Sequence, residues 1–457
     1  MSELRSLRND ARYLSRDEAE ALARRVLSFV TAEEARVTIN SGSRGNTRFA
    51  VNQISTAGDN FNTTVTVRAR VGRRIGSSTT NRLDDDALRA AVGTAERLAR
   101  LSPEDPEFVS ELGPQTYPSA SAWSDATASL EPTTRAAAVR TISEPARGAE
   151  LQSTGYLEAR AGSFCVANTR GLFAWGRDTS LALTTTVRTP DGTGSGWAGA
   201  SHFDWSRIDP AALGARAIEK ARRSVEPAAV EPQRYTVVLE PTAVGNLVQL
   251  IMGAMNARAA AEGRSFFTRA GGGTKLGERV VDARVSLVSD PHDPEGPVVP
   301  FTGEGLPLAR TVWIDNGVVR NLAYDRYWAE REGRAPQPTM GTFRMSGGDA
   351  SLEDLIRSTE RGLLVTRFWY IRSVDPRTIL YTGLTRDGTF LIENGRVTRP
   401  VKNLRFNESP IFMLNNLEAM GRPVRVSASE AGGPGSAVIV PPLKVRDFTF
   451  TSLSDAI

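Results

Sequence analysis

The chain has 457 residues, of which 40% are hydrophobic and 24% are charged. This composition is typical of a folded globular protein, and the length favours two domains over one. No segment approaches the roughly 18 uninterrupted apolar residues of a membrane-spanning helix, so no membrane span is expected. The net charge is +4 and the arginines are scattered among strand residues, so nucleic-acid binding is not expected.

The N-terminus and the cysteine content bear on the cellular compartment. The chain starts with Met1-Ser2-Glu3-Leu4-Arg5 and continues into a charged segment without the apolar stretch of a secretory signal. The single cysteine, Cys165, cannot form an internal disulfide. Both features predict a cytoplasmic protein.

Helical and strand patterns alternate through the first half of the chain. Ser15 and Glu18 form a capping-box pair before an apolar stripe at helical spacing. Helices are predicted over residues 16–30, 85–101 and about 209–225, and strands over 65–71, 156–168 and 172–189. Residues 102–128, rich in proline, serine and alanine, are expected to form a surface connection. These patterns predict an N-terminal α/β domain with helices on a mixed sheet.

Residues 226–233 contain two prolines and few apolar residues, which places the domain boundary there. The N-terminal domain is therefore expected over residues 1–228 and the C-terminal domain over 229–457. A strand at 235–239 and a helix at 242–261 open the second domain. Asn316-Gly317 and Asn394-Gly395 each lie between apolar runs and predict β-hairpins. The second domain is thus predicted to be β-rich with few helices, and the whole fold to be α+β.

Histidine is scarce, because the chain contains only His202 and His292. A zincin-type hydrolase needs two histidines one helical turn apart and a glutamate that activates water. A site built from His202, His292 and Cys165 would join three unrelated segments. We interpret these residues as two surface histidines and one buried strand cysteine.

Other patterns also have ordinary structural explanations. Residues 290–296 combine acidic residues, His292 and two prolines without regular spacing, which predicts an acidic surface loop. The glycine-rich segments 192–196 and 271–275 match neither a P-loop nor a dinucleotide fingerprint and are expected to be flexible loops. Residues 361–372 mix aromatic residues with arginines but alternate as a strand does. No G-x-S-x-G motif supports serine-hydrolase chemistry.

A set of segments spread over most of the chain forms a combined pattern: 72–76, 80–83, 167–171, 237–245, 315–317, 362–368, 382–390, 392–395 and 400–403. Together these segments resemble the TldD/TldE (PmbA) peptidase family. The family's zinc-bearing subunit carries H-E-x-x-x-H on the helix after the 237–239 strand, and a third ligand, a cysteine, near the C-terminus. When Pro241 and Gly245 serve as anchors, the corresponding positions are Gln249, Leu250, Ala254 and, near the C-terminus, Ser427.

These four side chains give a zinc ion almost nothing to bind. The resemblance therefore implies a TldE/PmbA-like subunit without catalytic, cofactor-binding or metal-binding residues of its own. It further implies a heterodimer in which a TldD-like partner holds Zn²⁺ and cleaves an unfolded peptide.

Two alternatives stay open at this point. The first is a stand-alone homodimeric binding or regulatory protein of the PmbA type, which binds peptides or acts as a gyrase modulator does. The second is an independent hydrolase that uses carboxylates such as Glu240 or Asp282.

Overall fold

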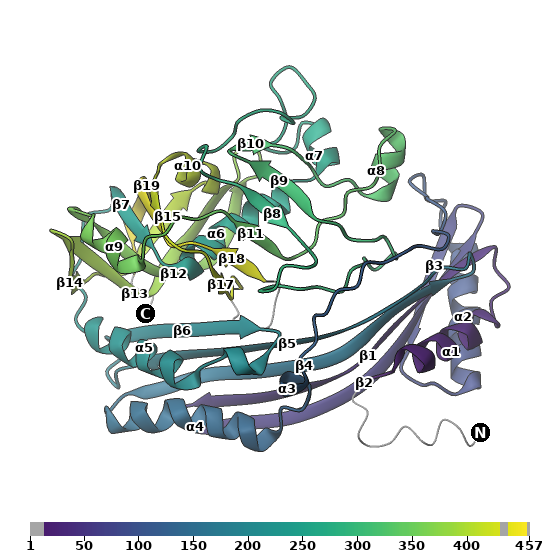
Figure 1. Ribbon diagram of the computed structural model, residues 1–457, viewed down its shortest axis with the longest axis horizontal. Helices are drawn as coiled ribbons and strands as arrows, with labels where there is room; N and C mark the ends of the chain where they lie inside the picture. Colours follow the sequence, from purple (N-terminus) through teal and green to yellow (C-terminus); the bar gives the residue numbers. More distant parts are fainter. Residues whose placement is uncertain (1–12, 430–436, 455–457) are drawn as a thin grey trace.

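The computed structural model describes residues 13–429 and 437–454. Residues 1–12, on which the expectation about a secretory signal rests, lie outside this description. An N-terminal sheet with helices on one face lies beneath a β-rich C-terminal unit (Figure 1). The α+β class and the β-rich second half are confirmed. No helix in the described ranges is long and apolar enough to cross a membrane.

The N-terminal sheet has six strands in the order β3-β2-β1-β4-β5-β6. Their bounds are β1 Glu34–Ala50, β2 Gln53–Val71, β3 Arg74–Thr80, β4 Gln152–Asn168, β5 Phe173–Arg188 and β6 Ser195–His202. All neighbouring strands run antiparallel, so the prediction of a mixed sheet was wrong. Most neighbours follow each other directly along the chain, and a short turn can only join antiparallel strands.

Helices cover one face of this sheet. Their bounds are α1 Arg16–Leu27, α2 Asp85–Leu101, α3 Asp125–Ala128, α4 Pro132–Gly148 and α5 Pro210–Arg223. The capping box of Ser15 and Glu18 is present, and Asp209 caps α5 as predicted. Helix α4 was not predicted, because Pro145 lies inside it and small residues weaken its apolar stripe.

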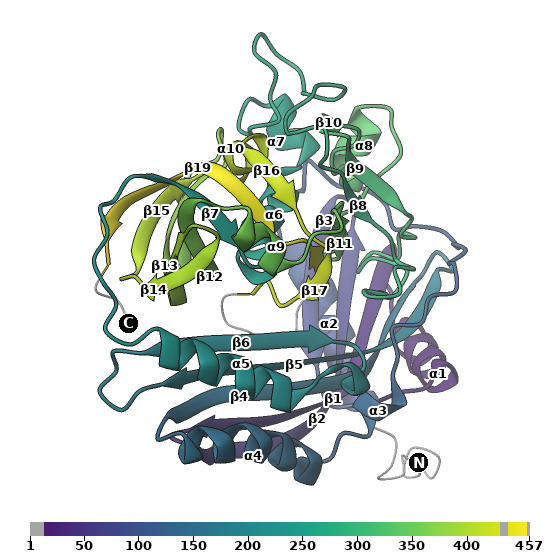
Figure 2. The same ribbon diagram turned by 60° about the vertical axis from the view of Figure 1, so that its left-hand side comes forward.

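Side-chain alternation along the strands separates the two faces of the sheet. Val37 and Ile39 of β1 and Cys165 of β4 pack beneath α1 and α2. On the opposite face, Phe164 and Val166 of β4 contact Phe301 of the C-terminal unit. A strand exposes alternate residues to opposite faces. The C-terminal unit therefore lies over the face that the helices leave free, as Figure 2 also shows.

The C-terminal unit contains two sheets. Their strands are β7 Arg234–Leu239, β8 Leu287–Ser289, β9 Thr311–Asp315, β10 Val318–Val319, β11 Phe343–Met345, β12 Arg361–Asp375, β13 Leu380–Glu393, β14 Arg396–Pro400, β15 Leu404–Glu408, β16 Leu417–Met420, β17 Val424–Val426, β18 Val438–Val440 and β19 Leu443–Leu453. Because β12 pairs with both β7 and β13, the strands β12, β7, β19, β15 and β13 close on themselves. Both Asn-Gly hairpins are confirmed, and all four turn residues have positive φ.

The predicted helix at 242–261 is two helices, α6 Pro241–Ala254 and α7 Ala257–Ala261. The chain leaves the helical path at Met255, and the Asn256 side chain accepts a hydrogen bond from Ala259 N to start α7. Three further short helices lie in this unit, α8 Arg326–Arg331, α9 Leu352–Arg357 and α10 Pro410–Asn415. Helix α6 is buried in the main core through residues such as Leu247, Val248 and Ile251.

Candidate functional site

A cavity of about 420 Å³ lies between α6, β6 and the segment that follows β17. Gln249 of α6, Ser201 of β6 and Ser427 line it, together with Met340 and Phe343. We call this cavity the α6 pocket. It draws residues from both halves of the chain, so it exists only because the C-terminal unit lies on the N-terminal sheet.

The sequence of α6 holds the 426–428 segment close to the helix. A Cβ added at Gly245 would lie 2.8 Å from Val426 Cγ2, so only glycine permits this approach without a shift. The side chains of Asn246 and Gln249 both donate to the carbonyl oxygen of Ala428, at 2.8 and 2.9 Å. These contacts bring Ser427 to the pocket wall beside Gln249.

The structure therefore brings together two of the four positions that the resemblance assigned to the zinc site. Gln249 and Ser427 line the same pocket. Leu250 and Ala254 are partly buried and pack against the C-terminal core instead. The assignment of these four positions to a former zinc site stays a prediction.

These side chains do not fit a zinc ion. The amide nitrogen of Gln249 already donates a hydrogen bond to Ala428 O. Leu250 and Ala254 have no side-chain atom that could coordinate a metal ion. Within residues 13–429 and 437–454, no three His, Cys, Asp or Glu side chains are grouped so that they could hold a metal ion. We derive no catalytic step through zinc in this chain.

The two histidines and the cysteine differ in their burial. Cys165 is buried, as predicted, and burial raises the pKa of its thiol to about 12. His292 is exposed, but His202 is only 6% exposed, so its interpretation as a surface residue was wrong. His202 ends β6 where the C-terminal unit covers the sheet, and Asp204 N donates to its Nδ1 atom.

Burial, reinforced by the nearby Arg425, lowers the pKa of His202 to about 4. An unfolded chain would protonate this histidine near pH 6.5. The free energy of unfolding should therefore fall by about 2–3 kcal/mol as the pH drops from 6.5 to 4. His202→Gln should lose this part of the pH dependence in urea unfolding, while His292→Gln should keep it. If the free energy of unfolding falls equally with pH in both variants and in the parent chain, His202 is not the group that causes the fall.

The other candidate carboxylates are engaged in ion pairs. Glu240 accepts from Lys220 Nζ at 2.7 Å, and Asp282 pairs with Arg284 at 2.8 Å. In the 290–296 loop, Asp293 pairs with Arg344 at 2.7 Å. Hydrogen bonds from Arg284 hold the pKa of Asp282 at about 2, which makes it a poor proton acceptor. These contacts give the independent-hydrolase alternative no support.

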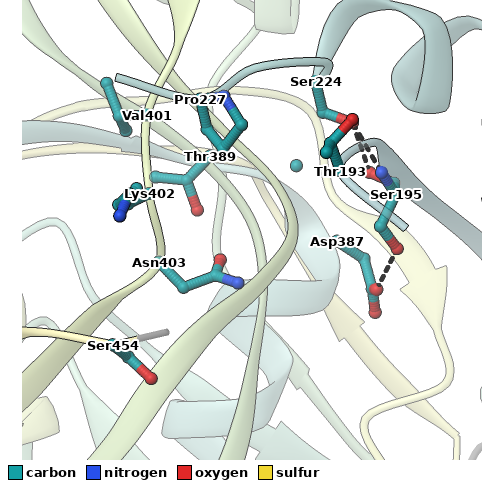
Figure 3. A pocket seen from close by; sticks show the side chains of 11 residues that line it. Thr193, Ser195, Ser224, Pro227, Asp387, Thr389, Val401, Lys402, Asn403 and Ser454 are labelled. Carbon is teal, nitrogen blue, oxygen red and sulfur yellow. Dashed lines mark hydrogen bonds between the residues drawn. The ribbon is translucent and has the colours of Figure 1, made fainter. Parts of the chain in front are cut away.

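A second cavity, of about 320 Å³, lies where the two halves of the chain meet (Figure 3). Its wall includes Asp387 of β13, which accepts a hydrogen bond from Ser195 Oγ of β6 at 2.6 Å. Arg367 Nε donates to the same carboxylate at 2.9 Å. Burial alone would raise the pKa of Asp387, but Arg367 and the Ser195 hydroxyl lower it below its usual value. The carboxylate is thus a structural anchor between the halves.

Sequence reasoning did not find Ser195, Ser201 or Asp387. The first two lie in a serine- and glycine-rich segment, and Asp387-Gly388 reads as a turn within a strand. Both Asp387 and Gly388 have positive φ. The Asp-Gly pair between two strand-like runs was the one signal that the sequence offered.

Three family models match the chain. They are the PmbA/TldA metallopeptidase domain 1 over residues 35–99, the central domain over 125–225 and the C-terminal domain over 232–452. Together they cover most of the 457 residues.

The chain belongs to the PmbA/TldD family.

Two relatives named metalloproteases are distant from this chain in sequence. A metalloprotease from Methanothermobacter thermautotrophicus is 24% identical over 328 residues, which cover 66% of this chain and 69% of that protein. A metalloprotease from Methanocaldococcus jannaschii is 27% identical over 45% of this chain, and the match spans 48% of its own length. The second match therefore spans only about half of that relative.

Solved structures share the fold over nearly the whole length. TldE from Thermococcus kodakarensis superposes with a TM-score of 0.82 at 18% identity, and the match covers 95% of this chain and 99% of that one. A protein from Bacteroides thetaiotaomicron, named a "putative modulator of DNA gyrase", gives a TM-score of 0.82 at 23% identity over 96% and 99% of the two chains. At these identities the likeness establishes the fold.

The family models bear on the expected domain division without deciding it. The C-terminal model begins at residue 232, close to the predicted boundary after residue 228. The N-terminal half is divided between two models, although its strands form one continuous sheet. The division at 1–228 and 229–457 stays a prediction.

Proposed function

We propose that this chain is the non-catalytic, TldE-like subunit of a TldD/TldE-type zinc metallopeptidase complex that degrades or processes unfolded peptides. The observation that carries the proposal is the chemistry of the assigned positions within a family whose relatives are named metalloproteases. Gln249, Leu250, Ala254 and Ser427 offer neither a zinc-ligand set nor a glutamate base. The bond-breaking metal therefore belongs to a partner subunit of the same family.

The α6 pocket supports a role in that complex. Helix α6 spans Pro241–Ala254 and has a buried face, although the assigned positions lack zinc ligands. The pocket beside it is formed and accessible. A wall of this kind suits a subunit that encloses the substrate while its partner supplies Zn²⁺.

The test is reconstitution with a family member that carries H-E-x-x-x-H. The purified chain alone should not cleave an unfolded peptide, and the partner with this chain should cleave it faster than the partner alone. The activity of the pair should disappear with a zinc chelator. Glu→Gln in the partner's motif should abolish cleavage, whereas Asp282→Asn here should not. Chelator-resistant cleavage by the lone chain would refute the proposal.

A second candidate is a stand-alone homodimeric binding or regulatory protein. It is favoured by the superposed proteins from Bacteroides thetaiotaomicron and Thermotoga maritima, both named putative modulators of a DNA gyrase. This candidate predicts a stable homodimer in solution and no zinc-bearing companion after affinity purification. Recovery of a family member with H-E-x-x-x-H would instead favour the peptidase complex.

The proposed location is the cytoplasm. The support is the single cysteine, Cys165, which is buried in β4 and has no disulfide partner. Fractionation of cells that express the tagged chain tests this location, and recovery outside the cytoplasm would contradict it.

A further inference from the structure

Two buried hydroxyl groups in the α6 pocket lack hydrogen-bond partners. Ser201 is 5% exposed and Ser427 is 3% exposed, and both residues line the pocket. Neither Oγ atom is hydrogen-bonded to any described residue. Buried polar groups are nearly always paired, so two such groups at one cavity indicate a site for a polar ligand.

Gln249 adds a third polar group to the same wall. Its Nε2 atom donates to Ala428 O at 2.9 Å and to Asn246 O at 3.3 Å. These bonds orient the carboxamide, and its Oε1 atom accepts no hydrogen bond from the described residues. The pocket thus offers a fixed acceptor on α6 and two hydroxyls that both donate and accept.

The remaining wall combines polar and apolar side chains. Among the described residues that line the pocket, none is charged; Thr339 and Ser429 add polar groups, and Met252, Met340 and Phe343 contribute apolar surface. A charged ligand would lose its hydration here without compensation. Methionine side chains adapt to differently shaped apolar groups, which suits a site with broad tolerance.

The neighbouring cavity differs in having charged residues in its wall. It measures about 410 Å³, adjoins the α6 pocket at Gly341, and is lined by Asp178 and Arg425. Charged residues therefore lie in the wall of the neighbouring cavity, and none of the described residues that line the α6 pocket is charged. This difference between the two cavities favours a neutral ligand for the α6 pocket. Such a ligand both donates and accepts hydrogen bonds and carries an apolar substituent.

We infer that the α6 pocket binds an internal residue of an extended peptide through its main-chain amide, with the apolar side chain against Met252, Met340 and Phe343. This inference rests on the proposed function and names the part of the peptide that this subunit holds. Ser201, Ser427 and Gln249 Oε1 are the hydrogen-bonding partners of the amide. The chain then binds part of the substrate, in addition to forming part of the wall that encloses the substrate in the complex.

Ligand-observed NMR on the full-length chain tests the inference with two matched probes. N-acetyl-leucine amide carries the neutral amide and the apolar side chain, and N-acetyl-leucine replaces the terminal amide by a carboxylate. The amide should bind saturably and the carboxylate at least several-fold more weakly. Equal binding of both probes, or binding of neither, would overturn the inference.

Variants then locate the site. Ser201→Ala and Ser427→Ala should each weaken binding of the amide about 3- to 10-fold, the loss expected for one neutral hydrogen bond. Ser427→Leu should abolish binding by filling the pocket. Ser180→Ala, in the neighbouring cavity, is the matched control and should bind as the parent does. Unchanged binding in the three pocket variants, with native thermal unfolding, would place the ligand elsewhere and overturn the inference.

The two proposals fail in different ways. Probe binding uses the isolated chain and needs no partner, so it can succeed even if reconstitution yields no peptidase. If the reconstituted pair cleaves peptides equally well with Ser427→Leu, and the isolated chain binds neither probe, the inference falls while the proposed function stands.

Discussion

Asp387→Asn should lower the free energy of unfolding by about 3–5 kcal/mol, the range for removing one partner of a buried ion pair. The Asp387 side chain is 0% exposed and the Arg367 side chain 8% exposed. Arg367 Cζ also lies 4.7 Å from the ring centroid of Trp197 and 5.1 Å from that of Trp369. Without the carboxylate, its charge stays buried and unpaired between the two halves of the chain. Urea unfolding followed by circular dichroism measures the loss.

Asp315→Asn is the matched control for this experiment. Asp315 pairs with Arg320 at 3.4 Å, but its side chain is 41% exposed. Exposed pairs contribute at most about 1 kcal/mol because water screens them. A loss at Asp387 no larger than the loss at Asp315 would show that the Asp387 ion pair does not anchor the two halves.

Phe368→Ala should cost about 3–5 kcal/mol, as is typical for truncation of a fully buried phenylalanine. Phe368 of β12 is 0% exposed, and its ring centroid lies 4.7 Å from Phe406 of β15 and 5.5 Å from Phe448 of β19. These three rings fill the closed sheet of the C-terminal unit. Phe368 N also donates to Asn246 Oδ1, so the same strand supports α6.

The control for Phe368 is Phe412→Ala. Phe412 lies on α10 and is 61% exposed, so its truncation should change the free energy of unfolding by less than about 0.5 kcal/mol. Comparable losses for the two variants would mean that the closed sheet is not the stabilising core. The comparison also separates lost packing from a general effect of removing an aromatic ring.

The sequence predicted those helix starts and turns that depend only on a few adjacent residues. The capping box at Ser15, the Pro210 start of α5 and both Asn-Gly turns follow from the requirements of a few adjacent residues. Helix α4 was missed because its burial depends on the sheet it covers rather than on a strong apolar stripe. The strand order of the first sheet likewise depends on the pairing of β1 with β4, which lie far apart in the sequence.

The candidate site was only partly accessible to sequence reasoning. The resemblance assigned Gln249 and Ser427, which lie 178 positions apart in a sequence of 457, and both line one pocket. Ser201 escaped notice, because its role depends on how the C-terminal unit lies over the N-terminal sheet. His202 was assigned to the surface for the same reason. Burial that arises between domains leaves no periodic pattern in either segment.

Metal analysis of the purified chain after equilibration with zinc tests the central claim most directly. The positions in question carry an amide, two aliphatic side chains and one hydroxyl, so the chain should retain zinc well below one ion per molecule. A partner with H-E-x-x-x-H, treated in parallel, should retain about one ion. Stoichiometric zinc on this chain that Gln249→Ala or Ser427→Ala removes would contradict the account.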